Sequence, residues 1–405
     1  MKKYCVIQLG SLTDLFQTKR LILSLGKEQG QVHLVVPESL QEQAAILYPE
    51  VVLHVVSGEA QSLEELQRSP VSVALQQEEF TAVYNLHETQ QNMLLSSLFS
   101  PKIMKGYWQH DEREYCDTWL RCLSRVQGRQ RFLNVMDRWA HLCEAPVPSH
   151  MVNPIAMRKG GGIGVVLRDV TGQTLPVEVL AGCVNAVCTA SREAKVILFG
   201  EAGDEELVKA LLPLLKEKVA ANAVDRCFDS SFEEDMKSIS TLDMLVTADC
   251  SLMHAAAHVG TPVNAFFHSS AWCMENGPYG LGHRVWQADT SCAPCSASSS
   301  CAENYSCMHV FGEEQLQRFL AGKIDQNYPQ GVTGYVSMLD EVGVTYMPVF
   351  GAEEHAVERL ALRGVASEFV GIAKLSKTVA AGCANFYAEQ DWLLPHCSKF
   401  GGDDA

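Results

Sequence analysis

Four side chains that can bind a polar ligand lie within one short stretch of the sequence: Asp249, Cys250, Ser251 and His254. The apolar run "LDMLV" precedes them, and a helix-stopping Gly-Thr-Pro at 260–262 and the run "VNAFF" follow. This order predicts a strand, a polar turn, a short helix and a second strand. Open α/β sheets bind ligands where a strand ends and a helix begins. The stretch therefore predicts a ligand site, and the amides that open the helix favour an anion.

An alternation of strands and helices must position these residues. In the first half, apolar runs predict strands over 4–9, 31–37, 51–56 and 81–87, and the segments between them predict helices over 10–30, 40–47 and 64–80. Residues 111–145 also have a helical pattern, and the proline-containing segment 145–154 is typical of a linker. The alternation then resumes, with a long helix expected over 176–190. This pattern is typical of an α/β protein with a doubly wound parallel sheet in each half.

Length and composition restrict the classes of function. A chain of 405 residues predicts two domains of roughly 150–200 residues each. The formal net charge of −16 argues against a nucleic-acid-binding protein. No apolar run reaches the roughly 18–20 residues that span a bilayer. The 15 cysteines, without an export signal, predict mainly free thiols in a reducing cytoplasm.

The stretch "DCSLMHAAAHVGTPVNAFF" (249–267), followed by "NGPYG" (276–280), resembles the donor-site signature of glycosyltransferase family 9. These are the bacterial heptosyltransferases of lipopolysaccharide synthesis and their relatives. Three further segments support the resemblance, which covers about residues 4–320: "CVIQLGSLTDLFQTKRLILSL", "YNLHETQQNMLLSSLF" with "MKGYWQ", and "CAPCSASSSCAENYSCM".

The resemblance implies the GT-B fold, in which two Rossmann-like domains face each other across a cleft. Residues 1–150 would form the acceptor-side domain and residues 155–325 the nucleotide-sugar-binding domain. Residues 330–405 have no family counterpart, and their pattern predicts a mostly helical C-terminal extension. The implied chemistry is an inverting sugar transfer that needs no catalytic metal.

The resemblance gives the 249–254 stretch a role in donor binding. Ser251 and the following amides would hold a nucleotide diphosphate, Asp249 would accept hydrogen bonds from sugar hydroxyls, and His254 would donate to a phosphate oxygen. The alternative is that Ser251 only caps the helix and His254 is a buried helix histidine. Cys250-Ser251 replaces the Ser/Thr-Gly of the family, which bears on the identity of the donor.

Two further segments are expected to contact the donor. The family usually has a phosphate-binding lysine in the loop that corresponds to 167–176, where Arg168 is the only cation. A guanidinium can clamp phosphate, so Arg168 is the expected substitute, and a surface ion pair with Asp169 is the alternative. Asp204 and Glu205 follow another strand and could hold a ribose hydroxyl, or stabilise the first turn of the helix 204–216.

Asp14 is the expected general base. An inverting transfer needs one group to take the proton of the acceptor hydroxyl, and a carboxylate can do this. The resemblance places the catalytic Asp of the family at Asp14, although Thr13 stands where the family usually has Gly. The alternative is that Asp14 only caps the helix at 15–25.

A four-cysteine pattern in the second half could hold a metal. Cys292, Cys295, Cys301 and Cys307 have the spacing C-x2-C-x5-C-x5-C. Four thiols this close can ligate one tetrahedral ion, and a structural zinc or iron is favoured over two disulfides in a reducing compartment. The alternatives are reduced thiols or a disulfide formed during handling. No cofactor is expected for catalysis.

The sequence thus predicts a cytoplasmic glycosyltransferase that uses a nucleotide-sugar, with ADP-heptose favoured. The acceptor would be a lipopolysaccharide-type or other lipid-linked saccharide, a surface glycan or a protein hydroxyl. Two alternatives remain open: a nucleotide-sugar epimerase on the same fold, and a non-catalytic GT-B binding or assembly protein. Peripheral association with the inner membrane face and oligomerisation through residues 330–405 are further expectations.

Overall fold

The computed structural model describes residues 1–27, 30–58, 62–126, 128–169, 171, 173–201, 203–227, 230–295, 301–323 and 331–373. The chain forms two compact units. The described part of the first consists of residues within 1–130, 135–148 and 358–373, and the second of residues within 131–134 and 149–357. The change from the first unit to the second at 148–149 falls inside the predicted linker 145–154.

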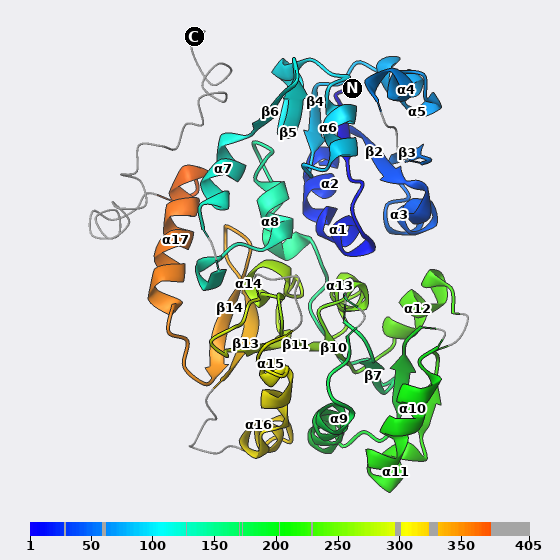
Figure 1. The fold of residues 1–405 in the computed structure, drawn as a ribbon, viewed down its shortest axis with the longest axis vertical. Helices are drawn as coiled ribbons and strands as arrows, with labels where there is room; N and C mark the ends of the chain where they lie inside the picture. The colour runs from blue at the N-terminus through cyan, green and yellow to red at the C-terminus, as the bar shows by residue number, and fades with distance from the viewer. Residues whose placement is uncertain are drawn as a thin grey trace. The chain divides into compact units, whose positions relative to one another are not determined.

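The first unit contains, within its described residues, a six-stranded sheet of order β3-β2-β1-β4-β5-β6 (Figure 1). Its strands are β1 (Lys3–Ile7), β2 (Gln31–Pro37), β3 (Val52–Val56), β4 (Ala82–Asn85), β5 (Met104–His110) and β6 (Arg113–Cys116). All pairs are parallel except β5 with β6. The chain runs outward from β1 to β3 and then returns to pair β4 with β1. The ends of β1 and β4 therefore form the topological switch point of this sheet.

Short helices connect these strands, and hydroxyl or carboxylate side chains fix the residues at which four of these helices begin. Ser62, Ser69, Thr89 and Asp117 each accept a hydrogen bond from a backbone N–H of the helix that they precede. The helices of this unit are α1 (Leu12–Gln17), α2 (Lys19–Gly26), α3 (Gln41–Leu47), α4 (Leu63–Gln67), α5 (Pro70–Gln76), α6 (Gln90–Ser96), α7 (Thr118–Ser124) and α8 (Val135–Ala140), joined by α17 (Ala356–Phe369) from the end of the described chain. Single 3₁₀ turns occur at Glu38–Leu40, Pro101–Ile103 and Gly128–Gln130 in this unit, and at Ser149–Met151, Leu212–Leu214 and Val310–Gly312 in the second.

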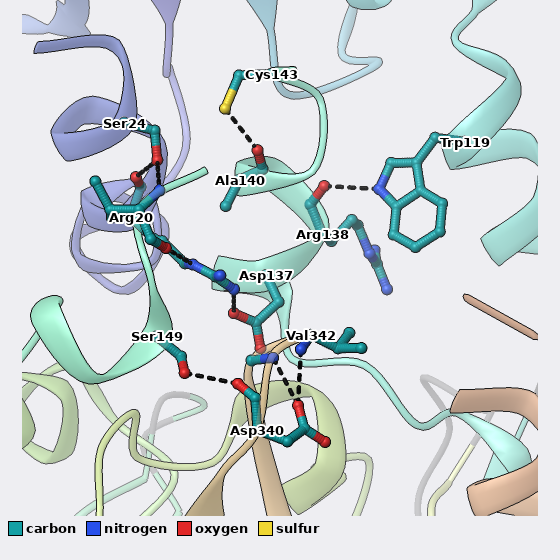
Figure 2. Close-up of polar contacts among 12 residues, drawn as sticks. Arg20, Ser24, Trp119, Asp137, Arg138, Ala140, Cys143, Ser149, Asp340 and Val342 are labelled. Atoms are coloured by element: carbon teal, nitrogen blue, oxygen red, sulfur yellow. Dashed lines mark hydrogen bonds and ion pairs between the residues drawn. The ribbon is translucent and has the colours of Figure 1, made fainter. Parts of the chain in front are cut away.

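The expectation of a helical segment over 111–145 is wrong in part. Its first residues form β6, and α7 and α8 are separated by loops. A buried ion pair fixes α8 against α2: Arg20 Nη1 lies 2.5 Å from Asp137 Oδ1, and Arg20 Nε donates to the carbonyl of Val147 at 3.0 Å (Figure 2). The Trp119 indole of α7 donates to the carbonyl of Arg138 at 3.0 Å. Long-range polar contacts thus hold α7 and α8 in place.

The second unit contains, within its described residues, an eight-stranded sheet of order β14-β13-β12-β11-β10-β7-β8-β9 (Figure 1). Its parallel strands are β7 (Ile163–Val166), β8 (Val196–Phe199), β9 (Ala223–Asp225), β10 (Met244–Ala248), β11 (Val263–Phe267) and β12 (Arg284–Ala288). The switch point lies between β7 and β10. The helices are α9 (Val177–Ser191), α10 (Glu205–Leu211), α11 (Glu217–Ala220), α12 (Phe232–Ile239), α13 (Ser251–His258), α14 (Cys273–Asn276), α15 (Ser306–His309) and α16 (Glu314–Leu320).

The predicted helical extension over 330–405 needs correction. Its first described part is a hairpin, β13 (Val332–Leu339) and β14 (Val344–Phe350), which adds two antiparallel strands to the second sheet. Asp340 closes the turn because its Oδ1 accepts from the backbone N–H groups of Val342 and Gly343 at 2.9 Å (Figure 2). Among the described residues of this extension, α17 is the only helix, and its Phe369 ring stacks on Trp119 with the ring centroids 5.6 Å apart. Residues 374–405 lie outside the described part of the chain.

Within the described residues, no helix has both the length and the apolar character that a membrane crossing requires.

Candidate functional site

The predicted donor stretch lies at the switch point of the second sheet, where β10 ends and α13 begins. Cys250, with an extended backbone (φ −158°), precedes the helix, and no hydrogen bond from its side chain caps the first turn. Its Sγ instead contacts Thr247 Oγ1 at 3.1 Å, inside the fold. Ser251 is the first helical residue rather than the cap that the alternative interpretation expected. The opening amides of α13 thus have no side-chain cap from Cys250, and their dipole favours an anion.

Asp249 is the most perturbed carboxyl group at this edge. Asp249 is buried, with 6% of the residue exposed. Burial and, to a lesser extent, the charge of Asp169 together raise the pKa of Asp249 to about 7, and a hydrogen bond with Asn276 opposes the shift. Strongly shifted carboxyl groups in α/β switch regions are characteristic of functional sites. Asp249 can therefore change protonation near neutral pH.

Two residues that were not predicted as site residues lie at the same edge of the sheet as Asp249. Asp169 follows β7, and His268 follows β11, so the strand order brings both to the same edge of the sheet. His268 Nε2 lies 3.9 Å from Asp169 Oδ2, and both side chains are more than nine-tenths buried. His268 Nδ1 contacts Ser269 Oγ at 3.0 Å. Burial lowers the pKa of His268, and Asp169 opposes this shift. Their positions shortly after β7 and β11, the two strands that flank β10, were the signal that could have identified them.

Arg168 makes a different ion pair from the one that the alternative expected. Its Nε contacts Asp204 Oδ1, whereas Asp169 turns its Oδ1 to Thr171 and Gln173. Asp204 is buried, and its Oδ2 also accepts from the backbone N–H of Glu201 at 2.8 Å. Asp204 therefore stabilises the loop after β8. Glu205 is exposed at the start of α10. Whether either contacts a ribose stays a prediction.

His254 lies on α13, and the residue is only 3% exposed. Its burial agrees with the alternative of a buried helix histidine. A role in phosphate binding stays a prediction.

In the first unit, Asp14 takes part in a capping box at the start of α1. Asp14 Oδ2 accepts hydrogen bonds from the backbone N–H and the hydroxyl of Ser11, both at 2.7 Å, and Ser11 Oγ accepts from the Asp14 N–H. A Cβ atom at Gly10 would lie 2.5 Å from Asp14 Oδ2, so only glycine fits beside this carboxylate. Asp14 therefore helps to cap a helix, as its alternative interpretation expected, but Ser11 is the N-cap and Asp14 lies inside the first turn of α1. The chemical role of Asp14 stays a prediction.

A histidine joins this edge of the first sheet. His87 Nε2 lies 2.5 Å from Gln8 Oε1, and the two residues follow β4 and β1. The charge of Asp14 acts on His87 and opposes the lowering of its pKa by burial. In the sequence, His87 is the last residue of the predicted strand 81–87.

The four cysteines of the predicted metal site lie close enough to influence one another. Cys307 is buried, and Cys292, Cys295 and Cys301 are half-buried. Burial raises the pKa of Cys295, and the other three thiols raise it further. Residues 296–300 lie outside the described part of the chain. Among the described residues, no group of three or more His, Cys, Asp or Glu is arranged to hold a metal ion, and the metal site stays a prediction.

Solved structures with the same architecture define the class of fold. The ADP-heptose LPS heptosyltransferase II of E. coli aligns with a TM-score of 0.52 and 18% identity over 70% of this chain and 90% of that one. The glycosyl transferase family 9 protein of Veillonella parvula DSM 2008 aligns with a TM-score of 0.51 and 17% identity over 69% and 83%. The chain thus has the GT-B fold of glycosyltransferases, as predicted.

Part of the second unit matches a family model. Residues 185–306 match the model of glycosyltransferase family 9 (heptosyltransferase), and this segment contains Asp249, Ser251 and His254. The resemblance and the enzyme class predicted from the sequence, a glycosyltransferase, are thereby confirmed. No curated protein matches the chain.

Proposed function

We propose that the protein is an inverting glycosyltransferase that moves a sugar, with heptose favoured, from a nucleotide diphosphate to a hydroxyl of a lipopolysaccharide-type or other lipid-linked saccharide, a surface glycan or a protein. The observation that carries this proposal is the family match over 185–306, which includes the strand end and helix start of the donor stretch. In this proposal the protein is a bacterial enzyme of the cytoplasm that associates peripherally with the inner membrane face.

The geometry of the second unit supports a donor site at the β7–β10 switch point. The amides of α13 favour the diphosphate, and Asp249 can hydrogen-bond a sugar hydroxyl in either protonation state. Arg168, which is about one third exposed, is fixed at its Nε by Asp204. This ion pair restricts the orientation of the guanidinium, and the planar group can bind phosphate through its other nitrogens.

Transfer with inversion forms one bond at the anomeric carbon and breaks another. The acceptor oxygen forms a bond to the anomeric carbon, the bond from that carbon to the diphosphate oxygen breaks, and the electron pair leaves with the nucleoside diphosphate. The proton of the acceptor hydroxyl passes to a base in the first unit, for which the resemblance implies Asp14. Removal of that proton by a positioned base typically contributes about 10²–10⁴-fold to the rate.

One observation favours a non-catalytic binding protein as a second candidate. The loop after β7 contains no lysine among residues 167–176, and its arginine already has a carboxylate partner in Asp204. A site that binds the donor with less positive charge on the leaving group would stabilise its departure less.

Calorimetric titration with ADP-heptose, ADP-glucose and UDP-, GDP- and CMP-sugars tests the proposal. One donor should bind the wild type, and Arg168→Ala and Asp249→Asn should weaken that binding. Lys209→Ala is the matched control, because Lys209 forms an exposed pair with Glu206 on α10. Absence of binding at millimolar concentration would refute the function. Binding without release of free nucleotide identifies the non-catalytic alternative, and an isomerised sugar identifies an epimerase.

The proposal extends to a structural zinc or iron on Cys292, Cys295, Cys301 and Cys307. Four thiolates suit either ion in their chemistry, but the described thiols are not arranged around one position, so metal binding requires them to draw together. Elemental analysis of protein purified without chelators should find one metal per chain, and Cys295→Ser should lose it while Cys116→Ser retains it. A metal-free wild type with four titratable thiols in this segment would refute the site.

A further inference from the structure

The β13–β14 hairpin supports the turn that follows α14. Tyr346 of β14 is completely buried, and its hydroxyl donates a hydrogen bond to the carbonyl of Pro278 at 3.2 Å. A Cβ atom at Gly277 would clash with the same hydroxyl, so the backbone of the turn lies directly against the end of the tyrosine side chain. Gly277 and Pro278 belong to "NGPYG" (276–280), which resembles part of the donor-site signature. The hairpin therefore contacts the donor segment.

The other strand of the hairpin holds the far end of this segment. Ser337 lies on β13 and is buried. Its Oγ accepts from the backbone N–H of His283 at 2.9 Å, and its own N–H donates to the carbonyl of His283 at 2.8 Å. The N–H of Gly282 donates to the carbonyl of Ser337 at 3.0 Å. Both strands of the hairpin thus hold the chain between α14 and β12.

The start of α14 is fixed by the sheet. Gln287 of β12 is buried, and its Oε1 accepts from the backbone N–H of Cys273 at 3.0 Å. Its Nε2 donates to the carbonyl of Ala271 at 3.3 Å. Because α14 has only four residues, contacts at its start and at the turn after its end leave its last residue, Asn276, little freedom to move.

Asn276 connects this arrangement to the donor stretch. Its side chain forms a hydrogen bond with Asp249, the residue that directly follows β10. A route of contacts therefore runs from the Tyr346 hydroxyl through the turn after α14 to the carboxyl group of Asp249. Every contact on this route lies within the second unit.

The charged groups around Asp249 come from other elements. Asp169, after β7, acts on Asp249 directly, and His268, after β11, faces Asp169 at 3.9 Å. On α14 itself, Glu275 forms an ion pair with Arg131. The hydrogen bond from α14 opposes the effects of burial and of Asp169, because it favours the charged form of the carboxyl group.

We propose that the β13–β14 hairpin is part of the donor site and that Tyr346 is a positioning residue, which holds Asn276 against Asp249 through the turn after α14. This inference rests on the proposed function. Tyr346 is completely buried and acts only through this turn. The carboxyl group of Asp249 is thereby oriented before the donor arrives, and such preorganisation increases affinity because less freedom is lost on binding.

The effect on Asp249 can be measured without any donor. In protein labelled with ¹³C at the aspartate carboxyl groups, the signal of Asp249 is assigned by its loss in Asp249→Asn and followed against pH. The wild-type midpoint should lie at about 7. Tyr346→Phe removes only the hydroxyl and should move the midpoint upward by about half a pH unit or more, because a weaker hydrogen bond to the charged form raises the pKa.

Tyr48→Phe is the matched control for this substitution. The hydroxyl of Tyr48 also donates to a backbone carbonyl in a buried position, that of Leu15 at 2.7 Å, but in the first unit. Its loss should leave the midpoint of Asp249 where it is in the wild type. An equal shift in both variants would overturn the proposal.

Two further variants test the route through the turn. The methyl group of Gly277→Ala would clash with the Tyr346 hydroxyl and the carbonyl of Cys273, so the turn must shift and the midpoint should rise at least as far. The double variant Asn276→Ala with Tyr346→Phe should have the midpoint of Asn276→Ala alone, because the hydroxyl acts on Asp249 only through Asn276. Additive shifts would overturn this route.

Calorimetric titration with ADP-heptose tests the role in binding. Tyr346→Phe should raise the Kd of the donor about 3- to 10-fold, the effect of one buried hydrogen bond, and Tyr48→Phe should stay within about twofold of the wild type. Weaker binding with an unchanged midpoint would show a merely structural role and overturn the proposal. A shifted midpoint with unchanged affinity would overturn it as well.

The outcomes separate this inference from the proposed function. If the wild type binds the donor and Tyr346→Phe changes neither the midpoint nor the Kd, the proposed function stands and the hairpin is not part of the site. If the wild type binds no nucleotide-sugar, the proposed function fails and the role of the hairpin in donor binding fails with it. The midpoints measured without donor then still decide whether Tyr346 positions Asn276.

Discussion

Asp249 shows how one buried side chain can make the stability of the second unit depend on pH. A carboxyl group in an unfolded chain titrates near pH 4, whereas burial and Asp169 raise the pKa of Asp249 to about 7. Between these values the folded state binds the extra proton. Stability conferred by the neutral carboxyl is therefore fully present at low pH and is lost as the pH rises toward 7.

We expect Asp249→Asn to remove this dependence, because the amide cannot ionise. Relative to the variant, the wild type should lose up to about 1.4 kcal/mol of unfolding free energy for each pH unit between pH 5 and 7. Urea unfolding of both proteins at pH 5, 6 and 7 gives the difference. A difference that stays constant across this range would contradict the shifted pKa.

Gly10 tests the geometry around Asp14. A methyl group at position 10 would lie 2.5 Å from Asp14 Oδ2, so Gly10→Ala must displace the carboxylate and open the capping box. Loss of a cap costs about 0.5–2 kcal/mol, and we expect activity to fall about tenfold or more if Asp14 supports proton transfer. Melting curves and ADP release measure the two effects.

Gly26→Ala is the matched control for this substitution. Gly26 is the last residue of α2, and a Cβ there meets no atom within 4 Å. The control should keep full activity and gain up to about 0.5–1 kcal/mol of stability. Equal losses in both variants would show that the close contact at Gly10 has no special effect.

At the scale of elements, the hydrophobic pattern correctly predicted those helices and strands whose formation depends on nearby residues. The long helix was expected over 176–190 and is Val177–Ser191, and the strand, turn and helix around Asp249 were also correctly predicted. The strand β13 was missed because it pairs with β12, whose residues lie about fifty positions earlier, as in Val285 opposite Tyr335, and β14 was missed because it pairs in turn with β13. The joining of Asp169, Asp249 and His268 follows from strand order, which spacing along the chain does not show.

The ion pair between α2 and α8 gives the element scale its own prediction. Arg20 and Asp137 are almost completely buried, so either one alone would leave an unpaired charge inside the first unit. We expect Arg20→Met or Asp137→Leu to cost about 3–5 kcal/mol, and the double variant to recover much of this loss. Urea unfolding of the three variants completes the cycle. Additive losses would show that the two charges stabilise the unit independently.

At the scale of the whole molecule, the described fold ends at α17, and the position of a truncation decides whether the second unit survives. Removal of residues 330–405 deletes β13 and β14, whose Val332, Tyr335 and Phe350 are buried, and uncovers the edge of β12 and the buried Trp286. An exposed apolar edge of this kind promotes aggregation. Removal of residues 374–405 leaves every described element in place.

We therefore expect the chain ending at 373 to melt cooperatively and bind the donor as the full chain does. The chain ending at 329 should aggregate or lose the thermal transition of the second unit, because two strands and their buried side chains are missing. Light scattering, circular dichroism and donor titration compare the three proteins. If the chain ending at 329 keeps its donor affinity and melting temperature, the hairpin is not part of the folding unit. A change of oligomeric state on removal of 374–405 alone would instead assign the expected oligomer contact to those residues.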